Sequence, residues 1–256
     1  MSETTSSDSR SIAGRPTQGT AYSPLYQQIK VLLLKSLDQG EWKPGESIPS
    51  ELELASRFQV SQGTVRKAID ELAADNLLIR RQGKGTFVAT HQEAKVRYRF
   101  LRLSPDTGNP AQTSSKILDC VRVKCPADIA ALLQLRSGDT VVNLKRLLSF
   151  NGEPTILDDI WLPGSVFKDL DANTIKDNKA PLYALFEIKY GVSMVRADEK
   201  IKAVCPTSEQ ASLLQVESET PLLFVERVSF TYGDRPMEVR RGLYITSSFH
   251  YKNSLN

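Results

Sequence analysis

One stretch of the sequence, residues 50–88, restricts the possible fold more than any other. It holds two short amphipathic segments separated by a break in the apolar period, followed by a hairpin with two glycines in its turn. Ser50, with Glu53 three residues later, provides a capping box for the first segment. Ser61 can cap the second, in which Val65 and Ile69 begin an i, i+4, i+7 apolar face. The pattern predicts a helix, a tight turn, a second helix and a two-stranded wing.

Polar and basic residues occupy the opposite side of the second helix and the hairpin turn. Helix-turn-helix proteins present such a helix side to base edges and phosphates. A glycine-tipped basic hairpin can bring its backbone close to a groove and its cations close to phosphates. The residues concerned are Gln62, Thr64, Arg66 and Lys67 on the helix, and Arg81, Gly83, Lys84 and Gly85 in the hairpin.

The run PSELELASRFQVSQGTVRKAIDELAADNLLIRRQGKGTFV resembles the winged-helix head of GntR-family transcriptional regulators. The resemblance begins at Tyr22 and implies sequence-specific binding to operator DNA. Leu52 and Gln62 stand where many relatives carry Arg, so we expect a half-site that differs from theirs. Asn76 replaces a helix-ending Gly and is suited to a left-handed conformation. The predicted DNA-binding set is Ser50, Glu51, Ser61, Gln62, Gly63, Thr64, Arg66, Lys67, Arg81, Gly83, Lys84 and Gly85.

Length and composition fit two domains preceded by a tail. A chain of 256 residues is long enough for two ordinary domains. Residues 1–20 are Ser/Thr-rich and poor in apolar residues, which predicts a disordered tail. We expect a DNA-binding domain over 21–89, a polar linker over 90–96 and a second domain over 97–256. Within the first domain, Ser23 and Pro24 predict a helix with Ser23 as N-cap.

Charge and cysteine content exclude few classes of protein by themselves. The net charge of +3 is mild, but between Arg57 and Lys84 six cations oppose three acids, which favours contact with DNA. The three cysteines, at 120, 125 and 205, match no metal or redox spacing, so we expect buried free thiols in a reducing cytoplasm. No apolar run reaches membrane-spanning length and no signal peptide is visible. We therefore expect a cytoplasmic protein without metal, cofactor or membrane contact.

The sequence after the linker alternates between apolar strand patterns and short helical patterns. Strands are predicted over 97–103, 115–123, 140–150, 155–162, 198–204, 222–232 and 237–245. Helices are predicted over 126–133, 181–190 and 208–214. Long strands with interspersed short helices indicate an α+β fold with a mostly antiparallel sheet.

The segments DDIWLP, PLYALFEIKYG and ADEKIKA, in this order, resemble the UTRA effector domain of HutC-like GntR regulators, which has a chorismate-lyase-like fold. The resemblance implies an effector cleft lined by the sheet, in which an Arg holds an anionic group. The matching positions are Arg146, Asp158, Tyr183, Glu238 and Tyr244. A structural alternative stays open, in which Arg146 and Glu238 pair across strands.

Three departures from this family bear on the ligand. Leu148 stands where relatives that respond to phosphosugars have a second Arg, and Pro181 replaces their Ser. The Arg-x-Asp that usually follows the closing Tyr is also missing. These changes favour a small anion, such as a carboxylate metabolite, over a phosphorylated amino sugar.

Together the two resemblances predict a homodimeric transcription factor, a repressor by family expectation. It would bind a palindromic operator and respond to a small anionic metabolite, with the short linker as the route between the domains. Two alternatives stay open: a DNA-binding regulator without an effector, and a chorismate-lyase-like enzyme fused to a DNA-binding head. The enzyme hypothesis lacks support, because the sequence has no nucleophile elbow, paired histidines, metal spacing or phosphate-binding glycine loop.

Overall fold

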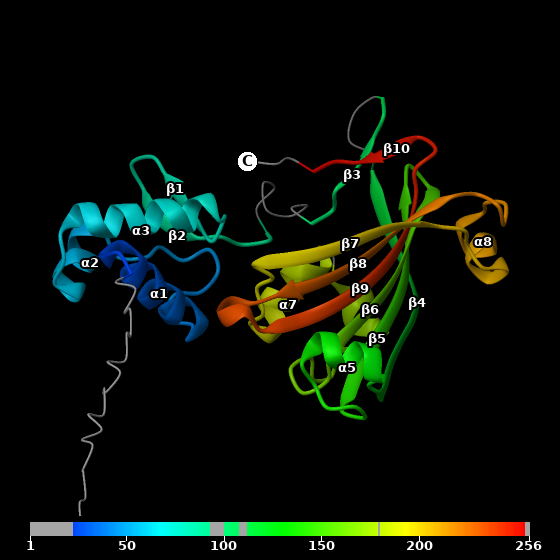
Figure 1. Ribbon diagram of the computed structural model, residues 1–256, viewed down its shortest axis with the longest axis horizontal. Coiled ribbons are helices and arrows are strands. Elements are labelled where there is room, and N and C mark those ends of the chain that lie inside the picture. Colours follow the sequence, from blue (N-terminus) through cyan, green and yellow to red (C-terminus); the bar gives the residue numbers. More distant parts are fainter. Residues whose placement is uncertain (1–22, 93–99, 108–111, 179, 254–256) are drawn as a thin grey trace, which may run out of the picture.

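The computed structural model describes residues 23–92, 100–107, 112–178 and 180–253. The predicted tail and most of the predicted linker lie outside these ranges. Figure 1 shows a small helical head joined to a larger domain built on one broad sheet. The predicted α+β class, with a winged helix-turn-helix head and a mostly antiparallel second domain, is confirmed.

The head consists of three helices and a two-stranded wing. Its elements are α1 (Leu25–Asp38), α2 (Glu51–Phe58), α3 (Gln62–Ala74), β1 (Leu78–Arg81) and β2 (Gly85–Val88). The apolar faces predicted for α2 and α3 meet α1 in one core, which includes the fully buried Leu33, Leu54, Ile69 and Leu72. Burial of these faces fixes the angle between α2 and α3 and leaves the polar side of α3 in solvent.

Local sequence signals explain where the head helices begin and end. The Ser50–Glu53 capping box is present, and the Ser61 side chain accepts a hydrogen bond from the Thr64 N–H, as predicted. Asn76 has the predicted left-handed conformation, with φ 57°. The prediction of Ser23 as N-cap is wrong. The extended backbone of Pro24 makes Pro24 itself the N-cap.

The second domain is organised around a six-stranded antiparallel sheet of order β4-β5-β6-β9-β8-β7. Its strands are β4 (Thr113–Lys124), β5 (Thr140–Phe150), β6 (Glu153–Pro163), β7 (Arg196–Val204), β8 (Leu222–Phe230) and β9 (Pro236–Ile245). Two short strands, β3 (Leu103–Pro105) and β10 (Phe249–Tyr251), pair beside it. The helical elements are α5 (Ala127–Leu133), α6 (Ala172–Asp177), α7 (Leu182–Tyr190), α8 (Ser208–Leu214) and the 3₁₀ turn η1 (Tyr232–Asp234).

Six of the seven predicted strands and all three predicted helices of this domain are present, with small shifts at their ends. The strand predicted over 97–103 is wrong for residues 100–102, and of its described residues only Leu103 lies in a strand, β3. The strand predicted to reach residue 232 ends at Phe230, because the chain turns into η1. The sequence did not predict α6, which buries no residue and so shows no apolar period.

Helices cover both faces of the sheet. Val142 and Leu144 of β5 point toward α7, whereas their neighbour Val141 packs with α5. On the same face as α5, Leu147 and Leu243 pack against α8. Because side chains alternate along a strand, the face that meets α7 also carries the even-numbered polar residues of β5, β6 and β9. That face forms the wall of a cavity.

The cysteines differ from the prediction in one case. Cys125 is buried and Cys120 is half-buried, but Cys205 is exposed, so the prediction of three buried thiols is wrong for Cys205. It follows the end of β7 and precedes Pro206, where the chain leaves the sheet.

Among the described residues, no group of three or more potential metal-binding side chains gathers. None of the helices in the described ranges is long and apolar enough to cross a bilayer.

Candidate functional site

Glu51 is the centre of the candidate DNA-binding surface. From the first turn of α2, its carboxylate accepts hydrogen bonds from Gln62 Nε2 at 3.2 Å and Arg66 Nε at 2.9 Å, both on α3. It also accepts from Arg80 Nη1 of the wing at 2.9 Å. Partial burial would raise the pKa of the Glu51 carboxyl, but these donors more than offset it, so the pKa lies below its ordinary value. The two helices and the wing therefore share one charged contact.

The four polar side chains predicted to face DNA from α3 differ in the contacts they make. Arg66 is 58% exposed even while paired, so it can present further N–H donors to a ligand. The Thr64 hydroxyl lies 2.8 Å from Ser61 Oγ at the helix start. Lys67 points away from Glu51, with Nζ 3.9 Å from the ring centre of Tyr26 on α1. Gln62 and Arg66 therefore form the pair nearest the wing.

The wing has the predicted shape and one further cation. Gly83 and Gly85 have φ of 69° and 106°, values that residues with a Cβ rarely adopt. Lys84 is exposed between them, and Arg81 lies over the Phe87 ring at 4.2 Å. Sequence reasoning missed Arg80, which pairs with Asp70 at 2.7 Å as well as with Glu51. Its place in β1, one residue before the predicted Arg81, was the available signal.

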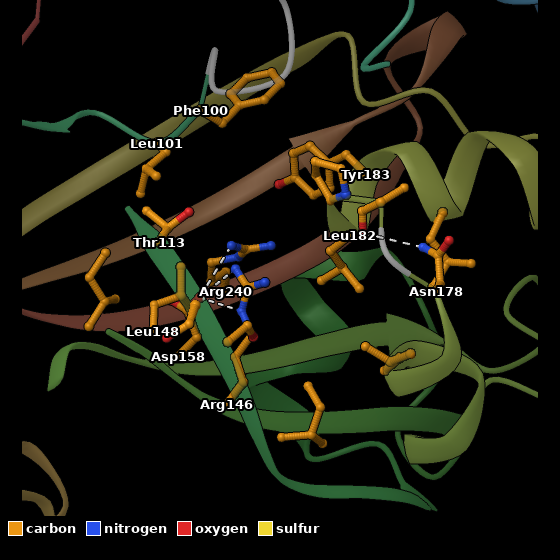
Figure 2. A pocket seen from close by; sticks show the side chains of 18 of the residues that line it. Phe100, Leu101, Thr113, Arg146, Leu148, Asp158, Asn178, Leu182, Tyr183 and Arg240 are labelled. Atoms are coloured by element: carbon orange, nitrogen blue, oxygen red, sulfur yellow. Dashed lines mark hydrogen bonds and ion pairs between the residues drawn. The ribbon is translucent and has the colours of Figure 1, made fainter. Parts of the chain in front are cut away.

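A cavity of about 470 Å³ lies between the sheet and α7. Four of the five residues predicted to bind the effector line it: Arg146, Asp158, Tyr183 and Tyr244. The fifth, Glu238, is fully buried behind the wall and reaches the cavity through its partners. Figure 2 shows Arg146 and Arg240 converging on Asp158, with Tyr183 and Leu182 approaching from α7.

The charged residues of this wall form a chain across three strands. Asp158 Oδ2 accepts hydrogen bonds from Arg146 Nε at 2.9 Å and from Arg240 Nη1 at 3.3 Å. Arg240 also donates from Nε and Nη2 to Glu238, at 3.1 and 2.8 Å. The alternative that Arg146 pairs with Glu238 is wrong, because the register of β5 and β6 places Arg146 directly opposite Asp158.

Burial and charge set the protonation of the groups facing the cavity. Burial would raise the pKa of the Asp158 carboxyl, but Arg240 and Arg146 outweigh it and lower the pKa. Burial, together with the charge of Glu238, raises the pKa of Tyr183 to about 12. Burial and the charge of Asp158 raise the pKa of Tyr244 to about 12. Both phenols are therefore neutral at physiological pH, while Asp158 is ionised.

The wall keeps unused hydrogen-bonding capacity of both kinds. A guanidinium has five N–H donors, and Arg146 and Arg240 both direct donors at the same oxygen of Asp158. The other oxygen, Asp158 Oδ1, is buried without a hydrogen-bond partner among the described residues. Gly242 lies opposite it on β9, and a Cβ there would be 3.1 Å from Oδ1. The wall therefore holds further N–H donors beside one carboxylate oxygen that lacks a partner among the described residues.

Sequence reasoning missed two arginines of the cavity, Arg227 and Arg240. Arg240 lies two residues after the predicted Glu238, so strand alternation places both on one face. Arg227 of β8 is directly opposite Arg240 in the sheet and donates to Glu199 at 2.6 Å. Leu148 and Pro181, two of the positions where the sequence departs from the family pattern, both line the cavity.

Comparison with known families identifies both parts of the chain. Residues 25–88 match the family "Bacterial regulatory proteins, gntR family". Residues 110–250 match the UTRA domain family. The first match spans the three helices and the wing, and the second spans all six strands of the main sheet.

Two similar proteins match most of the chain in sequence. The "Probable fructoselysine utilization operon transcriptional repressor" of Escherichia coli (strain K12) is 32% identical, over 87% of this chain and 91% of its own length. The histidine utilization repressor of Pseudomonas putida is 25% identical, over 87% and 88%. A crystal structure of a ligand-binding domain assigned to the GntR-family regulators of Bordetella bronchiseptica is 57% identical. It covers 62% of this chain and 99% of its own, with a TM-score of 0.61.

Proposed function

The chain belongs to the GntR family of bacterial regulatory proteins that carry a UTRA domain, and from this premise we propose how its two sites work together. It is a DNA-binding transcriptional regulator with an effector domain, and its family and relatives are regulators rather than enzymes. We propose that it is a cytoplasmic homodimeric repressor. In this proposal a small anionic metabolite fills the cavity and loosens the grip of the head on a palindromic operator.

One observation carries the choice of an anionic effector: Arg146 and Arg240 converge on a single carboxylate oxygen of Asp158. An incoming carboxylate can take the unused N–H donors of both guanidiniums, because these groups already lie side by side. A hydroxyl or ammonium group on the same ligand can then donate to the unpartnered Asp158 Oδ1. The best candidates are therefore hydroxy acids and amino acids.

The DNA side of the proposal follows from the polar and basic side chains of α3 and the wing. We propose that Arg66 and Gln62 contact base edges in the major groove, while Lys84 and Arg81 contact phosphates from the wing. Two-fold symmetry would place two such heads on successive half-sites. Leu52 is 69% exposed at the start of α2, so it can offer an apolar contact where relatives offer Arg.

A ligand screen tests the effector half of the proposal. Thermal-shift measurements with hydroxy acids, amino acids, dicarboxylates and sugar phosphates should give a hit among the carboxylates. Calorimetry should then show binding that Arg146→Ala removes. Lys145→Ala, which changes an exposed cation on the same strand, should retain that binding. If no compound in any class binds, the effector-independent regulator becomes the better reading.

Selection from random DNA tests the operator half. We expect an inverted repeat, with adenine favoured where the Gln62 amide replaces an arginine, because an amide suits adenine and a guanidinium suits guanine. Recovery of a guanine-rich half-site like that of Arg-bearing relatives would contradict the assignment.

Light scattering of the full chain should give the mass of a dimer.

A further inference from the structure

The two residues that follow the head, Thr90 and His91, are buried against α7. Glu187 Oε2 accepts hydrogen bonds from the Thr90 hydroxyl at 2.7 Å and from the His91 N–H at 3.0 Å. Its other oxygen accepts from the Ser193 hydroxyl at 3.1 Å. Glu187 is itself only 7% exposed. Because these hydrogen bonds converge on one carboxyl group and are shielded from water, losing them would be costly.

The His91 ring joins the same contact. Its Nε2 lies 2.9 Å from the Met194 carbonyl oxygen, and the ring packs edge-on against Tyr183, with centroids 5.2 Å apart. Phe100, on the far side of the linker in sequence, also packs edge-on against Tyr183 at 5.6 Å. The residues on both sides of segment 93–99 therefore touch one aromatic ring of α7.

Tyr183 also belongs to the cavity wall. Its hydroxyl donates to Glu238 Oε1 at 2.7 Å, and the Arg240 guanidinium carbon lies 5.4 Å from its ring centre. Tyr183 and Glu187 are four residues apart and so lie on one side of α7. One short helix therefore carries both a wall of the effector cavity and the buried contact to the linker.

The remaining contacts between the head and the second domain are of a different kind. Asp38 of α1 pairs with Arg235 at 2.8 Å, but the two side chains are 37% and 58% exposed. Surface pairs of this kind contribute little to stability. Val195 and Tyr232 add partial apolar contact with the core of the head. Among the described contacts between the domains, the hydrogen bonds of Glu187 and the one between His91 Nε2 and the Met194 carbonyl are the buried ones that hold the chain where it leaves the head.

We propose that Glu187 is the positioning residue that sets the orientation of the head according to the state of the cavity. Arg240 Nε and the Tyr183 hydroxyl donate to the same oxygen, Glu238 Oε1. A ligand that draws Arg240 away from this oxygen lets Glu238 and Tyr183 shift, and hence changes the packing of α7. The bonds from Glu187 to Thr90 and His91 then weaken and the head is released. The proposal rests on the effector function proposed above and names the residue through which that effector acts.

Hydrogen exchange of the full chain, measured by mass spectrometry without DNA or ligand, tests the first half of this proposal. In Glu187→Ala, exchange of the His91 amide, which donates to Glu187 Oε2, should rise about tenfold or more, the effect of losing a buried hydrogen bond. Peptides of β5 and β6 should keep their wild-type protection. Glu209→Ala, at an exposed position on α8, is the matched control and should change neither region. Unchanged protection at the His91 amide would overturn the proposal.

The second half of the proposal is that the cavity acts on the linker through α7. Its test needs a measurement that would not change if Glu187 only stabilised the fold. Tyr183→Phe removes the hydroxyl bond to Glu238 and keeps the ring that packs on His91. It should raise exchange at His91 several-fold in the wild-type background and add nothing in Glu187→Ala, because both changes act on one linkage. Additive effects would show that the cavity and the linker are independent, and would overturn the coupling.

Two features keep this test decisive. If Glu187→Ala does not fold, Glu187→Gln keeps one acceptor oxygen and should give a smaller rise in the same peptide. Neither exchange experiment uses an effector or an operator. A failed ligand screen would therefore refute the proposed function without changing these results, and failure of the exchange prediction would leave the effector and operator assignments standing.

Discussion

The head and the cavity contain the same kind of ion pair, between an arginine and a carboxylate, but these pairs differ in their exposure to solvent. In the head, Arg66 and Arg80 pair with Glu51 while their side chains are 58% and 41% exposed. In the cavity, the side chains of Arg240 and Asp158 are only 9% and 2% exposed. Exposed pairs contribute little and exchange readily with other charges, whereas a buried pair is costly to break from one side. The arginines of the candidate DNA-binding surface are therefore held loosely, and those that shape the cavity are held firmly.

The largest expected difference between the two regions is in stability. Glu238→Ala leaves Arg240 buried without its main partner and should lower the free energy of unfolding by ~3–5 kcal/mol. The matched change in the head, Glu51→Ala, should cost at most about 1 kcal/mol, because water can solvate both arginines. Urea denaturation of the full chain measures both. Equal losses would remove the distinction between loosely and firmly held pairs.

For DNA affinity, in contrast to stability, we expect the larger loss from a substitution in the head. Arg66→Ala should weaken operator binding by ~1–3 kcal/mol if its free donors contact a base. The unfolding free energy should change by no more than about 0.5 kcal/mol, as is usual for a surface substitution. Fluorescence anisotropy with a selected operator, beside a urea titration, measures both quantities. An Arg66→Ala protein with full affinity and full sequence preference would exclude Arg66 from base contact.

A substitution at Gly242 tests whether Tyr244 borders the ligand in the cavity. A Cβ at this position would lie 2.5 Å from Cε2 of Tyr244, which lines the cavity, so the ring would have to shift. Gly242→Ala should therefore destabilise the protein by ~1–3 kcal/mol, in the range of overpacked sites, and should weaken ligand binding. Operator affinity without ligand should stay at the wild-type value. Calorimetry with a hit from the carboxylate screen is the measurement, and unchanged ligand affinity would show that Tyr244 does not border the ligand.

The smallest effect belongs to the wing. Lys84→Ala should weaken binding to all DNA sequences similarly, and should flatten the slope of log affinity against log salt by ~0.9, the value for one lost phosphate contact. Arg136→Ala removes an equal charge from an exposed site in the second domain and should leave the slope unchanged. A Lys84→Ala protein with the full slope would exclude Lys84 from phosphate contact.

The sequence predicted the head almost completely because its signals are local. The capping box, the tight turn and the glycine-tipped hairpin each depend on residues within a few positions of one another, and Ser50, Ser61 and Asn76 behave as predicted. Strand and helix positions in the second domain were also predictable from periodicity. Arg80, which adjoins two distant acids, was the residue of the head surface that local reasoning missed.

The cavity was less predictable because its contacts depend on strand register. Arg146 pairs with Asp158 since these residues face each other in adjacent strands, and no local pattern distinguishes that partner from Glu238. The linker shows the same limit. Thr90 and His91 belong to a polar segment, and their burial depends on Glu187, which lies 97 and 96 positions away in the sequence. Long-range partners, rather than composition, decide whether such residues are exposed.

The central claim, that the cavity controls the head, is tested most directly by reciprocal binding. The effector identified in the screen should weaken operator binding by the full chain by a factor in the range of roughly 5–150, and the operator should weaken effector binding by the same factor. Arg146→Ala should lose this response and keep its operator affinity. If the effector binds equally well with and without operator, the two domains are not coupled and the account is contradicted.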